Sequence, residues 1–199
     1  MGLGVFEKVQ ESEWGMPAFP IPKKDNTIRF VFDARVLNAK IKRKPYPIPK
    51  TQDLLQRLGG FTYASSLDLN MGYWHIELNE KSSEHYKIVL PYTFGKHRYK
   101  RLPMGVASSP DIFQEKKQTL MEGLENVRTY LDDILVITKG SFQDHLNELE
   151  QVLIRLHAAG LKVNLPKSKI GVKEVEYLRY IITQHGVRPI SKKLRLCFE

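Results

Sequence analysis

Residues 130–137 read YLDDILVI, so that Asp132 and Asp133 stand side by side between two short apolar runs. Short apolar runs rich in β-branched residues are typical of buried strands. The aspartates therefore mark the turn of a hairpin, and Asp is a common turn residue. The alternative is a divalent-metal site, because two adjacent carboxylates repel one another and a hard cation such as Mg²⁺ offsets that cost.

A second acidic position of the same kind is Asp68, which lies between Leu67 and Leu69 at the end of an apolar run over 61–69. Alone, an aspartate at a strand end is usually a cap or turn residue. If two neighbouring strands present Asp68 and Asp132 at the same edge, the two carboxylates can form a two-metal clamp. Phosphoryl transfer needs such positioning and charge neutralisation.

The rest of the chain predicts strands and helices that interleave without strict βαβα alternation. We expect a hairpin over 16–37 with a basic tip, a proline-rich extended surface segment over 40–50, and short helices over 51–58 and from Ser109. A long helix over 142–159 and strands near 161–165 and 175–182 follow. The pattern predicts an α+β fold with a largely antiparallel sheet.

Two details of the helices are expected from local chemistry. Ser109 is predicted to cap the helix that Pro110 starts, with Lys116 and Lys117 facing water. In the long helix, Ser141 with Asp144 predicts a capping box, and Gly160 predicts the stop.

Composition excludes several protein classes. The 199 residues are 42% hydrophobic and 27% charged, which is ordinary for one globular domain with or without a satellite. We expect an intracellular protein that does not contact membranes, because no apolar run is long enough to span a bilayer and no leader pattern is present. Cys197 is the only cysteine, which excludes an intrachain disulfide and a cysteine metal cage.

The net charge is strongly positive, since 31 Lys and Arg residues against 22 Asp and Glu give +9. A polyanionic partner such as nucleic acid is the commonest explanation. A basic protein without such a partner is the open alternative.

Several segments together resemble one known family. YLDD at 130–133 and LDLNMGY at 67–73 resemble the catalytic motifs of reverse transcriptases, and the flanking text resembles the Gypsy-type LTR retrotransposon branch. That text comprises IPKKDNTIRFVFDARVLN at 21–38, RKPYPIPKTQDLLQRLGG at 43–60, LPMGVASSPDIFQ at 102–114 and HLNELEQVLIRLHAAGLKVNLPKS at 145–168. The resemblance extends from about Trp14 to about Pro189, with the segments in the family's order.

The resemblance implies a polymerase palm, a mostly antiparallel sheet packed on helices, with a partial fingers subdomain. Residues 1–60 would be partial fingers and the connection into the palm, and 61–190 the palm with a fingers insertion near 80–105. Residues 191–199 would start a truncated thumb, so the thumb is expected to be essentially absent, as are RNase H, integrase and protease regions.

The implied activity is RNA-directed DNA polymerisation with two Mg²⁺ ions, for which Mn²⁺ can substitute. Asp68 and Asp132 would bind both ions, and Asp133 would be the more peripheral carboxylate. The implied partners are an RNA or DNA template with primer, deoxynucleoside triphosphates (dNTPs), and other parts of a retroelement polyprotein. The compartment would be a cytoplasmic virus-like particle or the nucleus.

The resemblance also implies a nucleotide site. Lys23 and Arg29 would hold the triphosphate, and Tyr73 would pack beneath the sugar and exclude a 2′-hydroxyl. From the residues alone, a half-buried core aromatic is the preferred interpretation of Tyr73. Met104 and Gly105 would border the nucleotide pocket, where glycine permits close backbone approach.

Template and primer would contact Lys42, Arg43 and Lys44, and a hairpin that contains Leu178 and Arg179. The basic cluster 96–101 either joins them or is a solvated face. Arg179 stands where the family usually has glycine, which favours an alternative: an inactive remnant that keeps the palm fold and binds nucleic acid non-specifically. Another palm-type phosphotransferase, such as a cyclase, is the third possibility.

Overall fold

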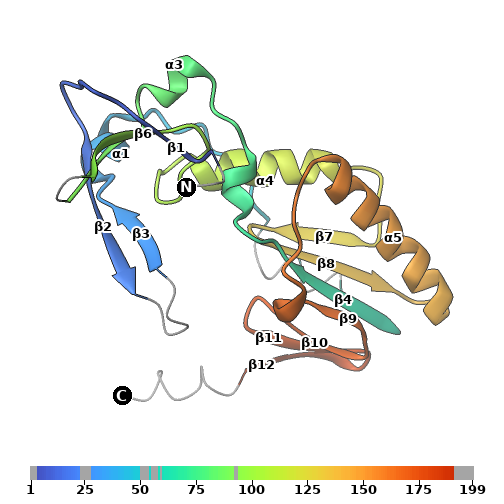
Figure 1. Ribbon diagram of the computed structural model, residues 1–199. Coiled ribbons are helices and arrows are strands. Elements are labelled where there is room, and N and C mark those ends of the chain that lie inside the picture. The colour runs from blue at the N-terminus through green and yellow to red at the C-terminus, as the bar shows by residue number, and fades with distance from the viewer. Residues whose placement is uncertain are drawn as a thin grey trace, which may run out of the picture. The chain divides into compact units, whose positions relative to one another are not determined.

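The computed structural model describes residues 4–22, 28–49, 54, 58, 60–91 and 94–190 (Figure 1). The chain divides into two compact units. Unit 1 comprises Met1–Pro45 and Tyr73–Phe113, and unit 2 comprises Tyr46–Gly72 and Gln114–Glu199. Unit 1 contains one sheet and unit 2 contains two, and each unit has its own buried apolar cluster.

Unit 1 is built on a five-stranded sheet in the order β1-β6-β5-β2-β3. Its strands are β1 (Phe6–Lys8), β2 (Met16–Pro22), β3 (Ile28–Phe32), β5 (Lys87–Leu90) and β6 (Gly95–Tyr99). All pairs are antiparallel except β2 with β5. Strands β2 and β3 form the hairpin predicted from the sequence, with Ala18 opposite Phe32.

The core of unit 1 gathers apolar side chains from the sheet and from the segments beside it: Val5, Met16, Ala18, Ala34, Ile88 and Tyr99. Three short helical segments complete the unit: α1 (Arg35–Lys40), η1 (Gly72–His75, starting at the last residue of unit 2) and α3 (Glu80–Ser83). After α1, residues 41–49 have no regular secondary structure, as their prolines predict.

Unit 2 is built on a four-stranded antiparallel sheet in the order β7-β8-β4-β9 (Figure 1). Its strands are β4 (Tyr63–Asp68), β7 (Val127–Tyr130), β8 (Asp133–Thr138) and β9 (Lys169–Val172). Strand β8 is central, and its residues from Ile134 to Thr138 are all buried. The apolar runs around Asp68 and Asp132 therefore form neighbouring strands, which is the condition that a two-metal clamp requires.

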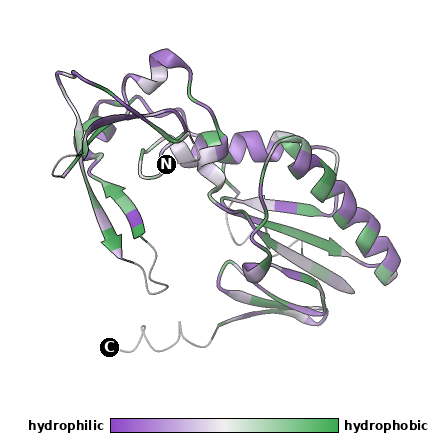
Figure 2. Cartoon of the chain, in the orientation of Figure 1, coloured by the Kyte–Doolittle hydropathy of each residue, from purple (hydrophilic) through white to green (hydrophobic). Residues whose placement is uncertain are grey.

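The long helix α5 (Phe142–Ala158) packs against β8 and β4, and Figure 2 shows polar and apolar residues alternating around it. Ser141 and Asp144 form the predicted capping box, and Gly160, at φ +70°, follows the helix end. A single 3-10 turn, η3 (Leu165–Lys167), leads into β9. The strand expected near 161–165 is only an isolated bridge between Val163 and Leu69.

A three-stranded antiparallel sheet completes unit 2, with β10 (Glu174–Tyr177), β11 (Tyr180–Thr183) and β12 (Gly186–Pro189). Strand β10 also packs on β4. Val175, Tyr177 and Ile182 join the core that contains Ala64 and Leu135. The structure confirms an α+β fold with largely antiparallel sheets.

Helix α4 (Ser109–Leu120) corrects two local predictions. Ser109 is not the cap, because it is the first helical residue and its hydroxyl donates a hydrogen bond to Pro103 O at 2.7 Å. Lys117 does not face water, because only 1% of its surface is exposed, whereas Lys116 is exposed as predicted.

Candidate active site

Three carboxylates converge at one end of the unit 2 sheet. Asp68 is the last residue of β4, Asp133 is the first residue of β8, and their Cα atoms are direct partners in the register. Residues directly opposite one another in an antiparallel pair project to the same face. Asp132 precedes Asp133 in the turn, and its carbonyl accepts a hydrogen bond from Leu69 N at 3.3 Å.

The electrostatics of these carboxylates show that they are crowded and poorly solvated. Burial raises the pKa of Asp132 and of Asp133, and the nearby charge of Asp68 raises both further. The Lys117 ammonium acts in the opposite direction on both pKa values. Among the described residues, none donates a hydrogen bond to the buried Oδ1 of Asp132.

This donor set fits a hard divalent cation. The ligands are oxygens only, and a buried carboxylate oxygen without a donor is suited to a metal ion. Within the described ranges, no group of three His, Cys, Asp or Glu side chains is already arranged to hold a metal ion. The protein ligands would therefore need further oxygens, for example from phosphate groups of a bound molecule.

The turn that carries Asp132 has an unusual backbone. Tyr130 and Asp133 pair with each other, so Leu131 and Asp132 form a two-residue hairpin turn. Leu131 has φ +45°, a left-handed conformation that costs a non-glycine residue about 1–2 kcal/mol. Contacts from a neighbouring element hold this strained turn.

Those contacts come from Gln114, which lies on α4 and is fully buried. Its Nε2 donates to Thr129 O at 3.0 Å, and its Oε1 accepts from Leu131 N at 2.9 Å. Gln114 thus satisfies backbone atoms of β7 and of the first turn residue, on the β7 side of the hairpin turn.

Lys117, one helical turn further along α4, makes the third contact. Its Nζ donates to Asp133 O at 3.1 Å. Burial lowers the pKa of Lys117 to about 7, although the Asp132 and Asp133 carboxylates act to raise it. The backbone atoms of Thr129, Leu131 and Asp133 are therefore all held by two side chains of one helix face.

The sequence patterns predicted no role at the acidic site for Gln114 or Lys117. The available signal was helical spacing, because Phe113, Lys117 and Leu120 recur at i, i+4 and i+7 and so share one stripe. Lysine on an apolar stripe is a buried charge that needs a partner. Gln114 lies three residues before Lys117 and faces the same way.

The predicted nucleotide residues belong to unit 1, whereas the three carboxylates belong to unit 2. Arg29 is exposed on β3, and Lys23 lies outside the described residues. Tyr73 is buried against Phe113, with ring centroids 4.7 Å apart, so it has a packing role in the core.

Met104 is half exposed, and Gly105 has φ +94°, which explains the glycine at that position. Asn38 fixes this segment: its Nδ2 donates to Gly105 O at 3.0 Å, and its Oδ1 accepts from Ala107 N at 2.8 Å. A contact of these residues with substrate stays a prediction.

Among the predicted template-primer residues, Lys42, Arg43 and Lys44 are all exposed, and Arg43 is also ion-paired. The Arg43 guanidinium forms a two-point ion pair with the buried Asp111, from Nε to Oδ2 at 2.6 Å and from NH2 to Oδ1 at 3.0 Å. Leu178 and Arg179 form the two-residue turn between β10 and β11, at φ +51° and +68°.

The basic cluster 96–101 is largely occupied by ion pairs within unit 1. Arg98 pairs with Glu7 and Glu84, and Arg101 pairs with Glu77. Paired cations are less available to phosphate, which favours the interpretation of this cluster as a solvated face.

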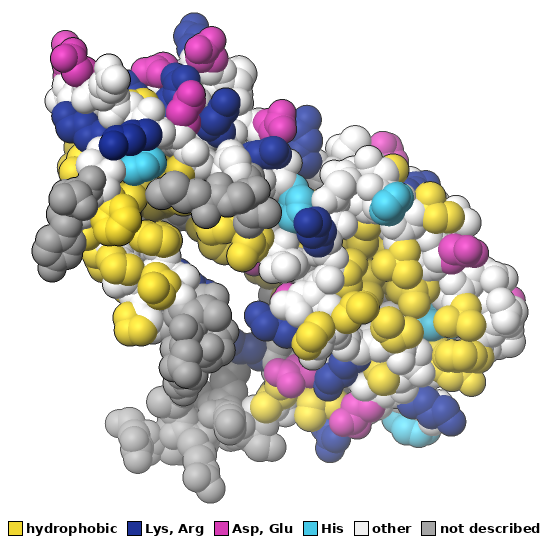
Figure 3. Space-filling model, viewed as in Figure 1, with side chains coloured by type: hydrophobic (Ala, Val, Ile, Leu, Met, Phe, Trp, Pro, Cys, Tyr) yellow, Lys and Arg dark blue, Asp and Glu magenta, His cyan; other side chains and the backbone are white. Residues whose placement is uncertain are grey.

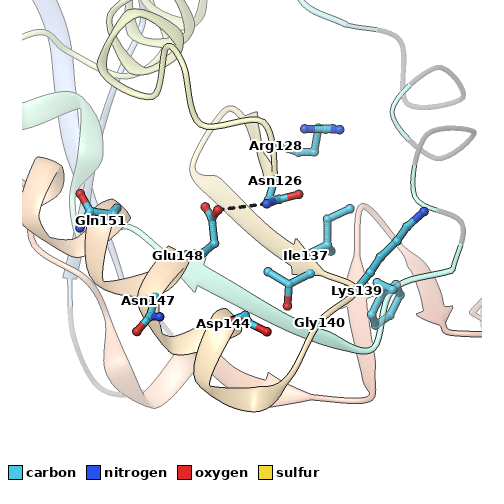
Figure 4. A pocket seen from close by; sticks show the side chains of 11 residues that line it. Asn126, Arg128, Ile137, Lys139, Gly140, Asp144, Asn147, Glu148 and Gln151 are labelled. Atoms are coloured by element: carbon cyan, nitrogen blue, oxygen red, sulfur yellow. Dashed lines mark hydrogen bonds between the residues drawn. The ribbon is translucent and has the colours of Figure 1, made fainter.

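Two further surface features lie outside the carboxylate site. Figure 3 shows apolar side chains over β2 and β3, where Phe19, Ile21, Ile28 and Phe30 are exposed. Figure 4 shows a pocket of about 740 Å³ in unit 2, in which Asn126 Nδ2 donates to Glu148 Oε1 at 3.1 Å. None of the three carboxylates lines this pocket.

No helix in the described part of the chain is both long enough and apolar enough to cross a membrane.

Known proteins resemble this chain over most of its length. Residues 21–182 match the family described as reverse transcriptase (RNA-dependent DNA polymerase). The Pol polyprotein from the Drosophila melanogaster transposon 297 is 32% identical over 191 residues, covering 92% of this chain and 18% of the relative. The Transposon Tf2-3 polyprotein of Schizosaccharomyces pombe is 32% identical over 180 residues, covering 89% of this chain and 13% of the relative.

Solved structures of the foamy viral protease-reverse transcriptase are also similar. The complex with double-stranded DNA gives a TM-score of 0.88 at 30% identity, covering 98% of this chain and 34% of the other. The complex with an RNA/DNA hybrid gives a TM-score of 0.81 at 30% identity, and the match covers 98% of this chain and 26% of the other. The chain thus spans less than a fifth of the polyproteins described above. With a family match over 162 residues, a matching fold and three carboxylates at one sheet edge, the chain belongs to the reverse transcriptase family.

Proposed function

We propose that the carboxylate site catalyses RNA-directed DNA synthesis, the transfer of a deoxynucleoside monophosphate from a dNTP to a primer 3′-hydroxyl with release of pyrophosphate. The observation that carries the proposal is the direct pairing of Asp68 with Asp133, beside Asp132, in a chain of the reverse transcriptase family. Phosphoryl transfer of this kind depends on positioning and charge neutralisation, which an acidic sheet edge provides.

In this proposal Asp68 and Asp132 hold two divalent cations, Mg²⁺ or Mn²⁺, and Asp133 is the peripheral carboxylate. When bound, the cations neutralise phosphate charge and promote loss of the primer hydroxyl proton. The chain contributes the fixed oxygens: Gln114 holds the turn that carries Asp132, and the β4–β8 ladder fixes Asp68 opposite Asp133. The buried Oδ1 of Asp132 supports its assignment as a metal ligand.

The nucleotide roles follow from residue chemistry. Arg29 offers a planar fork and Lys23 a point charge to triphosphate oxygens. Tyr73 would exclude a 2′-hydroxyl through the rigidity of its packing on Phe113. The positive φ of Gly105 would let backbone beside Met104 approach the nucleotide.

We assign template-primer contact to Lys42 and Lys44, together with Arg43, Leu178 and Arg179. The solved foamy viral relatives are complexes with double-stranded DNA and with an RNA/DNA hybrid, which supports a template paired with a primer as the ligand. Because the relatives are polyproteins, other polyprotein parts are the proposed protein partners. The Gypsy-type assignment within LTR retrotransposons belongs to the same proposal.

Primer extension on an RNA template tests the activity. The chain should incorporate dNTPs in the presence of Mg²⁺, whereas Asp132→Asn should reduce incorporation by at least about a hundredfold because a metal-binding carboxylate is lost. Lys116→Gln, an exposed change on α4, is the matched control and should retain activity. Extension by the chain no faster than by Asp132→Asn would contradict the proposal.

A second function, nucleic-acid binding by an inactive palm, is favoured by one observation. Arg179 has a left-handed backbone at a turn where glycine would be unstrained. In that case, the chain would bind a primer-template in a salt-dependent manner without incorporating nucleotides. The extension assay separates the two functions.

A further inference from the structure

In the part of the chain that the structure describes, Lys117 is the one lysine among the large, fully buried side chains, and it lies on α4 next to the acidic site. Lys117 is 1% exposed, and its Nζ donates to Asp133 O at 3.1 Å. Both Asp132 and Asp133 interact electrostatically with its ammonium. A charged group taken out of water is costly unless opposite charges and hydrogen bonds compensate it.

Two functions can be assigned to such a side chain. As a hydrogen-bond donor, it holds Asp133 O and so helps Gln114 to fix the hairpin. As a cation, it partly neutralises the carboxylates that a metal ion would neutralise. In a poorly solvated environment, neighbouring charges interact more strongly than in water, so the second function bears on cation binding.

We propose that Lys117 is a positioning residue that also serves as a built-in counter-charge, lowering the affinity of the Asp68, Asp132 and Asp133 site for divalent cations. The inference rests on the proposed function, because it concerns the same carboxylates. It goes further because it assigns part of the control over the site's affinity for divalent cations to Lys117, a residue that is not a metal ligand.

The physical argument is a competition for the same negative charge. With Lys117 charged beside them, Asp132 and Asp133 attract a divalent cation less than the same carboxylates would beside an apolar side chain. A neutral residue at 117 should therefore tighten metal binding, while leaving the oxygens that contact the metal unchanged.

Two substitutions separate charge from hydrogen bonding. Lys117→Gln keeps an N–H donor for Asp133 O and removes the charge. Lys117→Met removes both and suits the apolar stripe of α4, so it provides a second folded variant. Lys116→Gln, on the neighbouring exposed lysine, is the matched control for the loss of one positive charge.

Calorimetric titration with MnCl₂ and MgCl₂ alone, without nucleotide or primer, measures the effect. Circular dichroism first establishes that each variant is folded. We expect Lys117→Gln and Lys117→Met to bind Mn²⁺ about tenfold more tightly than the unsubstituted chain, and Lys116→Gln to bind as the unsubstituted chain does. Electron paramagnetic resonance of Mn²⁺ gives an independent count of bound ions.

Equal Mn²⁺ affinity of the unsubstituted chain and of either folded Lys117 variant would overturn the inference, provided that Asp132→Asn abolishes binding. That result would leave the proposed function intact. Binding by Asp132→Asn at full affinity would instead remove the metal from these carboxylates, and the proposed function would fall together with the inference.

Discussion

Gln114 is the residue on which the acidic hairpin depends, because it pairs with backbone atoms of Thr129 in β7 and of Leu131, the first residue of the turn. Gln114→Leu keeps the volume but leaves the Leu131 N–H without this acceptor, which should destabilise the fold by about 1–3 kcal/mol. Urea unfolding measures the change. Gln118→Leu, at an exposed position of the same helix, is the control, and equal losses for both variants would contradict the assigned role.

The sequence predicted the acidic residues of the site but not the side chains that hold their hairpin in place. Asp68 and the Asp132–Asp133 pair are recognisable because a carboxylate between apolar runs is costly to bury unless a partner compensates its charge. Lys117 was assigned to the surface because lysine usually is exposed, although its spacing from Phe113 and Leu120 indicated the buried face. A helix stripe can be read from one segment, whereas the hydrogen bond to Asp133 O depends on tertiary packing.

The turn of the β10–β11 hairpin has a backbone conformation that its two residues, Leu178 and Arg179, do not favour. Leu178 and Arg179 both adopt positive φ, which two-residue turns require and which glycine adopts without strain. Arg179→Gly should raise the free energy of unfolding by about 0.5–1 kcal/mol, measured by urea denaturation.

Arg188→Gly provides the opposite control, because glycine inside strand β12 should lower stability. If Arg179→Gly destabilised the chain as much as Arg188→Gly does, the turn would not be strained. Greater primer-template affinity of Arg179→Gly would further support the assignment of this hairpin to primer contact.

Helix α5 and the sheet are joined by a buried histidine. His145 Nε2 lies 2.7 Å from Ser65 Oγ, and Nδ1 lies 2.9 Å from Thr138 Oγ1. Burial lowers the pKa of His145 below its usual 6.5, and the Glu148 carboxylate opposes this only in part. The unfolded state therefore takes up a proton first as the pH falls, so stability is full above about pH 6.5 and decreases below it.

Urea unfolding between pH 7.5 and pH 5 checks this expectation. His145→Gln should be less stable than the unsubstituted chain at pH 7.5 and should show a weaker dependence on pH. His157→Gln, at an exposed position of the same helix, should keep the full dependence. The same pH profile in all three proteins would assign the acid sensitivity to other groups.

The whole molecule has a net charge of +9, from 31 basic and 22 acidic residues, so its affinity for nucleic acid should depend strongly on salt concentration. Binding of a fluorescent primer-template should weaken by at least about tenfold between 50 and 200 mM salt. The double variant Lys42→Gln and Lys44→Gln should flatten the salt dependence by about two units of slope, if both side chains contact phosphate. Lys173→Gln is the control for a lysine without an assigned role, and an unchanged slope in the double variant would contradict the assignment.

The architecture was predictable where hydrophobic pattern and local capping agree. The β2–β3 hairpin, the strands around Asp68 and Asp132, and α5 with its Ser141 cap are confirmed. The strand expected near 161–165 was wrong, because apolar residues there make only one bridge before η3 begins. Composition alone does not mark the division into two units, because the chain passes between them without a linker of distinctive composition.

The left-handed Leu131 has a practical consequence for protein engineering. A peptide of residues 127–138 excised from the chain would lack the helix that compensates this conformation, and it should relax into a different turn. Transplanting the acidic motif into an unrelated scaffold would therefore require grafting a glutamine-bearing helix beside it, so the smallest portable form of this site is a helix and a hairpin together.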